Sequence, residues 1–169
     1  GNLQAFADLV RAHQQAVFNI AYRLLGNTQD AEDATQETFL RAYRFFDRFD
    51  PNRPFAPWVK RIAVNVCLNH MARRPTPYSL DADGAPPPPD AAPGPEARTL
   101  QRDLSRRVRA EVLALPPRYR AVIELRHFQG LSYTEIAEAL GRPLNTVKSD
   151  LFRARKLLAE RLKDLRETP

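Results

Sequence analysis

Apolar and charged residues alternate at helical spacing in the first part of the chain. The apolar residues recur about every three or four positions, which is the period of an amphipathic helix, and they predict helices over 3–25, 29–49 and 55–74. Gly26 and Asn27 are typical of the end of the first helix. These three helices predict a small bundle built around one core.

The apolar pattern stops in the segment 75–95, which holds eight of the fifteen prolines of the chain. A segment of this composition cannot build a core and is expected to be extended and flexible. We therefore predict an all-α fold in which a flexible, proline-rich linker over 75–95 joins two small helical domains, 1–74 and 96–169.

The helical spacing returns after the linker. It predicts helices over 96–115 and 117–129, which a Pro-Pro pair separates, and then a helical hairpin within 130–158. The hairpin carries the strongest local signals in the sequence, at the start of its first helix and at the turn between its two helices.

Ser132 and Glu135 have the spacing of a capping box at the start of the first helix of the hairpin. Gly141 is expected to end this helix because glycine tolerates a positive φ. Asn145 is expected to cap the second helix. The sequence therefore predicts two helices joined by a tight turn.

The second helix of the hairpin has two different faces. Its apolar stripe, which should pack on the first helix, consists of Val147, Leu151, Ala154 and Leu158. The opposite face combines an aromatic residue with basic, hydroxyl and amide residues: Asn145, Ser149, Phe152, Arg153 and Lys156. Such a face is typical of one that meets the phosphates and base edges of DNA. An ordinary amphipathic hairpin is the alternative.

The predicted helix 29–49 carries an isolated apolar residue on its polar side. Leu40 projects away from the apolar arc, among Asp33, Gln36, Glu37 and Arg44. A single exposed leucine is ordinary, whereas a leucine framed by acidic residues also suits a docking face for a partner with a basic rim. The residues alone leave both interpretations open.

The predicted helix 55–74 has basic, amide and aromatic residues along one edge. Trp58, Arg61, Asn65 and Asn69 line up there, and the nearby basic residues are Lys60, Arg73 and Arg74. Basic side chains bind phosphates, amides read unpaired base edges and aromatic rings stack on bases. For Trp58, a place in the core is the competing interpretation.

The charge distribution supports a polyanionic partner. The net charge is +6; residues 1–74 hold ten Lys/Arg against seven Asp/Glu, and residues 96–169 hold sixteen against ten. Both predicted domains are thus basic, which suits contacts with nucleic acid at two places.

Several kinds of chemistry find no support in the sequence. Cys67 is the only cysteine, so no intrachain disulfide can form, and a reducing cytoplasm is the expected setting. His13, His70 and His127 are scattered, and the sequence has neither a glycine-rich phosphate loop nor an apolar run of about 20 residues that would suit a membrane span. We expect no enzyme, no catalytic residue, no metal, no cofactor and no membrane span.

Two stretches together resemble a known family. The run GLSYTEIAEALGRPLNTVKSDLFRAR and the pattern DAED…QETFLRAY resemble regions four and two of the extracytoplasmic-function (ECF) sigma factors, small bacterial subunits that give RNA polymerase its promoter specificity. The resemblance implies binding to core RNA polymerase, through its β′ clamp helices and β flap, and to promoter DNA. The DNA would be duplex at the upstream element and single-stranded non-template strand at the downstream element. The family also implies an anti-sigma factor as a partner.

The resemblance assigns residues to three surfaces. For the upstream element it implies Asn145, Thr146, Lys148, Ser149, Phe152, Arg153 and Lys156. For the downstream element, where Asn65 would meet a flipped base, it implies Arg53, Phe55, Trp58, Lys60, Arg61, Asn65, Asn69, Arg73 and Arg74. For polymerase binding it implies Asp30, Asp33, Gln36, Glu37 and Leu40.

The sequence departs from the family pattern at Asp150, where a basic residue is usual, and at Asn145, where glycine is usual; Leu68, Asn69 and His70 also differ. On the flank of the DNA-binding face, Asp150 would repel phosphate. Two alternatives to a sigma factor are a stand-alone helix-turn-helix regulator, which would dimerise on a palindrome, and a decoy interaction module that no longer reads DNA.

Overall fold

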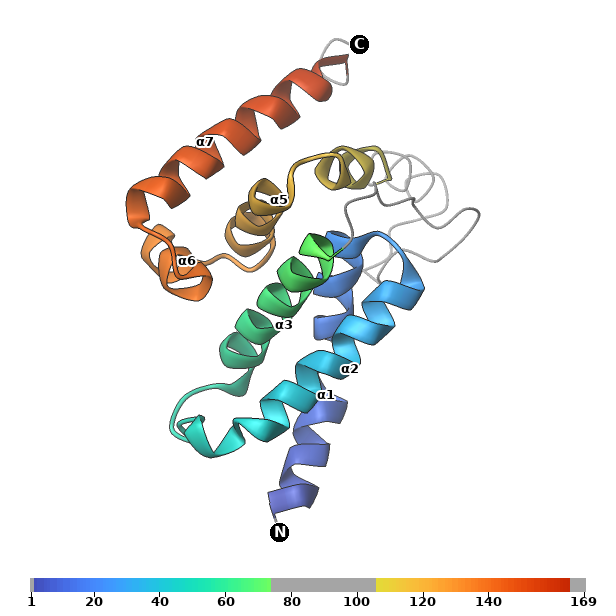
Figure 1. Ribbon diagram of the computed structural model, residues 1–169, viewed down its shortest axis with the longest axis vertical. Helices are drawn as coiled ribbons and strands as arrows, with labels where there is room; N and C mark the ends of the chain where they lie inside the picture. Colours follow the sequence, from blue (N-terminus) through green and yellow to red (C-terminus); the bar gives the residue numbers. More distant parts are fainter. Residues whose placement is uncertain (1, 74–105, 165–169) are drawn as a thin grey trace, which may run out of the picture. The chain divides into compact units, whose positions relative to one another are not determined.

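The computed structural model describes residues 2–73 and 106–164, and the described residues form helices without any strand. The chain divides into two compact units, Gly1–Asp81 (unit 1) and Ala82–Pro169 (unit 2), drawn in Figure 1. The all-α class is therefore confirmed. The predicted linker 75–95 lies outside the described residues, and the predicted domain limits stay a prediction.

Unit 1 is a bundle in which each helix packs against the other two. Its elements are α1 (Asn2–Leu25), α2 (Thr28–Arg44), the 3-10 turn η1 (Phe46–Arg48) and α3 (Phe55–Ala72). The predicted apolar positions form its core: Val17, Ile20, Leu24, Ala31, Ala34, Val59, Ala63 and Val66 are buried. The predicted second helix ends earlier than expected because Phe45 leaves helical geometry and the chain tightens into η1.

A cluster of aromatic rings joins α1, η1 and α3 near the loop that precedes α3. Phe55 lies at its centre, with ring centroids 5.5 Å from Phe49, 5.6 Å from Trp58, 6.3 Å from Phe46 and 6.4 Å from Phe6. Most of these pairs meet edge to face or tilted, which is the favoured arrangement of aromatic rings. The cluster fixes the start of α3 against α1 and η1.

Unit 2 begins, within the described residues, with a helix over 106–113. It continues with α5 (Pro117–Ile123), the π-helical turn η2 (Glu124–Phe128), α6 (Tyr133–Leu140) and α7 (Leu144–Arg161). The predicted helix 117–129 is thus correct in extent, but its second half has π geometry. The buried apolar side chains include Leu115, Val122, Leu125, Ile136, Val147, Leu151 and Ala154.

The hairpin of α6 and α7 begins as predicted. Ser132 Oγ accepts the Glu135 N–H at 3.1 Å, and Glu135 Oε1 accepts the Ser132 N–H at 2.8 Å, so the capping box is present. Gly141 ends α6 with a φ of 63°, and the Arg142 N–H reaches back to the Ala137 carbonyl at 3.0 Å. This backbone pattern is the Schellman ending of a helix.

The predicted cap of α7 is wrong. The helix already begins at Leu144, so Asn145 lies inside its first turn, and no side chain caps this end. Pro143 occupies the cap position with an extended backbone, and its carbonyl accepts the Val147 N–H at 3.2 Å. Proline suits the entry to a helix because its fixed φ is compatible with the first turn.

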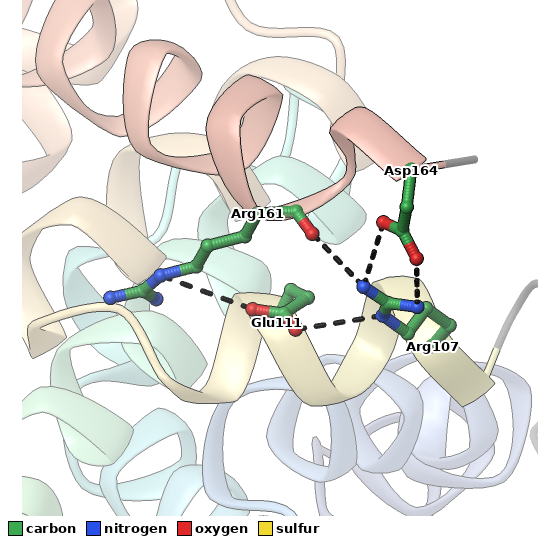
Figure 2. Close-up of polar contacts among 4 residues, drawn as sticks. All are labelled: Arg107, Glu111, Arg161 and Asp164. Atoms are coloured by element: carbon green, nitrogen blue, oxygen red, sulfur yellow. Dashed lines mark hydrogen bonds and ion pairs between the residues drawn. The ribbon is translucent and has the colours of Figure 1, made fainter. Parts of the chain in front are cut away.

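An ion-pair network connects the 106–113 helix to the end of α7 (Figure 2). Arg107 binds both carboxylate oxygens of Asp164, at 2.9 and 3.0 Å, and also donates to the Arg161 carbonyl at 3.0 Å. Glu111 lies between the two arginines, 3.6 Å from Arg107 and 3.9 Å from Arg161. A cation that binds a terminal carbonyl stabilises the C-terminus of a helix, so this network fixes the far end of α7.

Candidate nucleic-acid interface

Packing in unit 2 determines which face of α7 is exposed. Three residues of the predicted stripe, Val147, Leu151 and Ala154, are buried, and α7 packs against α5 and α6; the fourth, Leu158, is half-buried. The opposite face is exposed and carries the predicted residues Asn145, Lys148, Ser149, Phe152, Arg153 and Lys156, while Thr146 is half-buried. Phe152 is 69% exposed. An aromatic ring held in solvent between cations is available to a partner.

A shallow hollow lies on this face. It is lined by Tyr133 from the start of α6 and by Lys148, Leu151, Phe152, Arg155 and Lys156 from α7. Sequence reasoning missed Tyr133 and Arg155. Arg155 could have been predicted from helical periodicity, because it follows Lys148 by two turns and Phe152 by one and so shares their face of the helix. Tyr133 could not, since its place depends on how α6 packs against α7.

Cations dominate the surroundings of the hollow. The Arg126 guanidinium lies 4.8 Å from the centre of the Tyr133 ring. Arg155 is the main cause that lowers the pKa of the Tyr133 phenol, and the charges of Arg126 and Lys148 lower it further. A phenol whose ionised form is favoured in this way reports a positive local potential, which suits a phosphate group.

His127 belongs to the same group of side chains. Arg155 Nε donates to its Nε2 at 3.2 Å. Burial lowers the pKa of His127, and the nearby charges of Arg155 and Arg126 lower it further. His127 is therefore neutral at pH 7 and orients Arg155 as a hydrogen-bond acceptor.

Asp150 does not lie on this face, and the predicted repulsion of phosphate is wrong. The residue is only 2% exposed. One carboxylate oxygen lies 3.6 Å from Arg118 Nε and the other lies 3.5 Å from an Arg142 guanidinium nitrogen. Asp150 follows Val147 by three residues and precedes Ala154 by four, which places it on the inward side of the helix.

The predicted acidic face of α2 is present with one exception. Leu40 is 68% exposed, and Asp33 and Gln36 are exposed beside it. Glu37 is half-exposed and lies 3.7 Å from Arg41. These residues share the outer side of α2, so the surface that the sequence predicted exists.

Asp30 is the exception, because it is buried and cannot contribute to a surface contact. Its backbone N–H donates to the Asn27 side-chain oxygen at 2.9 Å, and its carboxylate accepts from the Asn27 amide at 2.8 Å. His70 of α3 lies 3.5 Å from the same carboxylate. Asp30 therefore connects the start of α2 to the end of α3.

The residues predicted for the downstream element divide into two groups. Phe55 is buried in the aromatic cluster, so its assignment as a DNA contact is wrong: three segments of unit 1 cover its ring. Trp58 is half-buried at the edge of that cluster, 5.0 Å from Phe49. The remaining described residues reach the surface: Arg53, Asn69 and Arg73 are exposed, and Lys60, Arg61 and Asn65 are half-buried. Arg74 lies outside the described residues.

Two further features bear on the kind of site. Within residues 2–73 and 106–164, no group of three His, Cys, Asp or Glu side chains is placed to hold a metal ion. Across the same ranges, none of the helices has the length and apolar character of a membrane span.

Comparison with known families places these surfaces in context. The profile of Sigma-70 region 2 matches residues 9–75, and that of Sigma-70 region 4 matches residues 105–158. The chain is 38% identical to the ECF RNA polymerase sigma factor SigW of Bacillus subtilis, covering 98% of this chain and 92% of that protein. It is also 38% identical to the ECF RNA polymerase sigma factor SigE of Mycolicibacterium smegmatis, covering 95% of this chain and 62% of that protein.

Two solved structures have similar folds. One is the sigma factor RpoE in complex with the anti-sigma factor NepR from Bartonella quintana, with 26% identity, a TM-score of 0.69, and coverage of 95% of this chain and 98% of that one. The other is CnrH in complex with the cytosolic domain of CnrY, with 29% identity, a TM-score of 0.66, and coverage of 97% and 91%.

Proposed function

The chain belongs to the ECF sigma factors of the sigma-70 family, and from this premise we propose how its surfaces divide the work of transcription initiation. It binds core RNA polymerase and directs it to promoters, which it recognises at an upstream and a downstream element. It acts as a regulatory initiation factor in the cytoplasm, and it catalyses no reaction itself.

The exposed face of α7 reads the upstream element in the major groove. Lys148, Arg153 and Lys156 supply charge for phosphates and donors for base edges, and Ser149 adds a hydroxyl. Phe152, with its exposed ring among these cations, suits contact with a thymine methyl group. This exposed aromatic on a basic recognition helix carries the proposal. Tyr133 and Arg155 extend the face toward the phosphate backbone.

The edge of α3 binds the melted downstream element. Asn65 and Asn69 offer amide groups to unpaired bases, Arg61 and Arg73 bind the backbone of the non-template strand, and Trp58 offers the outer edge of its ring. In this proposal Phe55 does not contact DNA; its ring packs against Trp58 and holds Trp58 and the start of α3 in place.

The outer side of α2 binds the β′ clamp helices of the polymerase through Asp33, Gln36, Glu37 and Leu40, and the second helical domain contacts the β flap. An anti-sigma factor regulates the protein. The proposed regulation by an anti-sigma factor is supported by two similar structures. That of RpoE contains the anti-sigma factor NepR, and that of CnrH contains the cytosolic domain of CnrY.

Transcription by reconstituted holoenzyme, the complex of this chain with core RNA polymerase, tests the proposed function. The holoenzyme should initiate at a specific subset of a promoter library, and core polymerase alone should not. The chain alone should bind duplex promoter poorly, which separates it from a stand-alone regulator. A holoenzyme without promoter preference would refute the proposal.

A further inference from the structure

The recognition helix α7 carries a buried carboxylate whose role the proposed function leaves open. Asp150 is in contact with Arg118, at the start of α5, and with Arg142, in the turn between α6 and α7. A buried charge is costly unless ion pairs compensate it, so the two arginines account for the stability of this acid. They do not show what its placement achieves.

The two arginines that pair with Asp150, Arg118 and Arg142, differ in their other contacts. Arg142 belongs to the turn, two residues before α7 begins. Arg118 instead continues toward the DNA-binding face: a second nitrogen of its guanidinium donates to the Tyr119 hydroxyl at 3.4 Å, and the guanidinium lies 5.1 Å from the Tyr119 ring centre.

Tyr119 completes a path to the exposed face of α7. Arg118 donates to its phenol oxygen, and Arg153 of α7 interacts with the same group; both arginines lower the pKa of Tyr119. Arg153 is one of the residues proposed to read the upstream element. A continuous series of polar contacts therefore runs from Asp150 through Arg118 and Tyr119 to Arg153.

We propose that Asp150 is a positioning residue for upstream recognition, which holds Arg118 against Tyr119 so that the Tyr119 hydroxyl orients Arg153 toward the DNA. The proposal rests on the proposed function of the α7 face. An arginine that is oriented before binding loses less conformational freedom on contact with a base. Without Asp150, Arg153 is less restrained, and Arg118 is free to attract phosphate regardless of sequence.

The test measures discrimination by the full-length protein in reconstituted holoenzyme. The probes are two promoter fragments that differ only in the upstream element: one selected by the wild-type holoenzyme from a randomised element, the other scrambled. The measured quantity is the ratio of transcription from the selected fragment to transcription from the scrambled one.

Asp150→Asn and Arg118→Gln should each lower this ratio roughly fivefold, within the range that one base contact contributes to discrimination. Arg142→Gln is the matched control, because it removes the other ion pair of the same carboxylate, and it should leave the ratio within about twofold of wild type. If Arg142→Gln lowers the ratio as much as Asp150→Asn, or if Arg118→Gln leaves it unchanged, the proposal is overturned. Arg118→Gln keeps the test decisive even where Asp150→Asn unfolds unit 2.

A double variant tests the path itself. In a Tyr119→Phe background the hydroxyl is gone, so Arg118→Gln should cause no additional loss of discrimination. Additive losses would overturn the proposal, since they would show that Arg118 acts independently of Tyr119.

Arg153→Ala separates this inference from the proposed function. If that variant keeps full discrimination, the proposed role of the α7 face fails as well; if only Arg153→Ala lowers the ratio, only the positioning role fails.

Discussion

Leu40 on α2 of unit 1 and Phe152 on α7 of unit 2 are the most exposed large apolar side chains of their helices, and the charges around them are opposite. Leu40 on α2 has Asp33, Gln36 and Glu37 on one side and Arg44 on the other, whereas Phe152 on α7 is surrounded by Ser149, Arg153 and Lys156. Both side chains are about equally exposed, so burial does not distinguish them. Their surroundings do: an acidic rim suits a basic protein surface and repels DNA, and a basic rim suits DNA.

A buried acid lies beneath each of the two surfaces. Each helix carries one inward-facing aspartate close to its functional side: Asp30 pairs with Asn27 and His70, and Asp150 pairs with Arg118 and Arg142. Asn27 is the cap of α2 itself, whereas His70, Arg118 and Arg142 come from other segments of the same unit. In both units, therefore, a buried acid fixes the helix that presents the exposed apolar residue.

The largest expected effect is loss of polymerase binding on substitution of Leu40. Leu40→Asp places a charge at the centre of the proposed contact, where a buried unpaired carboxylate is strongly unfavourable. We expect holoenzyme affinity to fall about a hundredfold or more, measured by titration of labelled protein with core polymerase.

Leu3→Asp is the matched control for this variant, because Leu3 is also a solvent-exposed leucine of unit 1, at 67% exposure. It should bind core polymerase normally. Equal losses in both variants would mean that the effect comes from added charge rather than from a contact at Leu40.

Phe152 on α7 is the counterpart of Leu40 on α2, and its substitution should affect promoter recognition. Phe152→Ala removes an apolar contact from the recognition face without changing its charge, and we expect about tenfold less transcription from the selected upstream element. Binding to core polymerase should stay unchanged, as measured by the titration used for Leu40. If Phe152→Ala weakens polymerase binding instead, the proposed division between the two surfaces is wrong.

A smaller effect is expected from Arg155, which the sequence interpretation missed. Arg155→Gln removes a cation from the hollow beside Tyr133 while keeping its polar character. If Arg155 contacts one phosphate, the slope of log affinity against log salt for holoenzyme on duplex promoter should decrease by about 0.9. Arg11→Gln, on the exposed side of α1, is the control and should leave the slope unchanged. An unaltered slope for Arg155→Gln would place this residue outside the DNA contact.

The sequence was sufficient for the helices and for most exposed site residues, because periodicity determines which residues share a face. It led to errors at Asp30, Asp150 and Phe55. At the two acids the prediction assumed solvent exposure for a charged residue, and the compensating partners come from segments up to dozens of residues away. The ring of Phe55 is enclosed by Phe6 and Phe46, and no local pattern in the sequence reveals that enclosure.

The smallest predicted effect is a pH dependence of the stability of unit 2. The pKa of His127 is lowered in the folded protein, first by burial and then by Arg155 and Arg126. The unfolded chain therefore binds a proton more readily than the folded one, and the free energy of unfolding falls as pH decreases through the ordinary histidine pKa of about 6.5.

In His127→Gln this contribution disappears, because glutamine does not titrate. The drop in melting temperature between pH 7.5 and pH 5.5 should then be smaller than in wild type by on the order of one degree, as measured by circular dichroism. His13→Gln, whose ring lies in unit 1 against Phe55, controls for the loss of any histidine. A wild-type drop retained in full by His127→Gln would show that folding does not lower the pKa of His127.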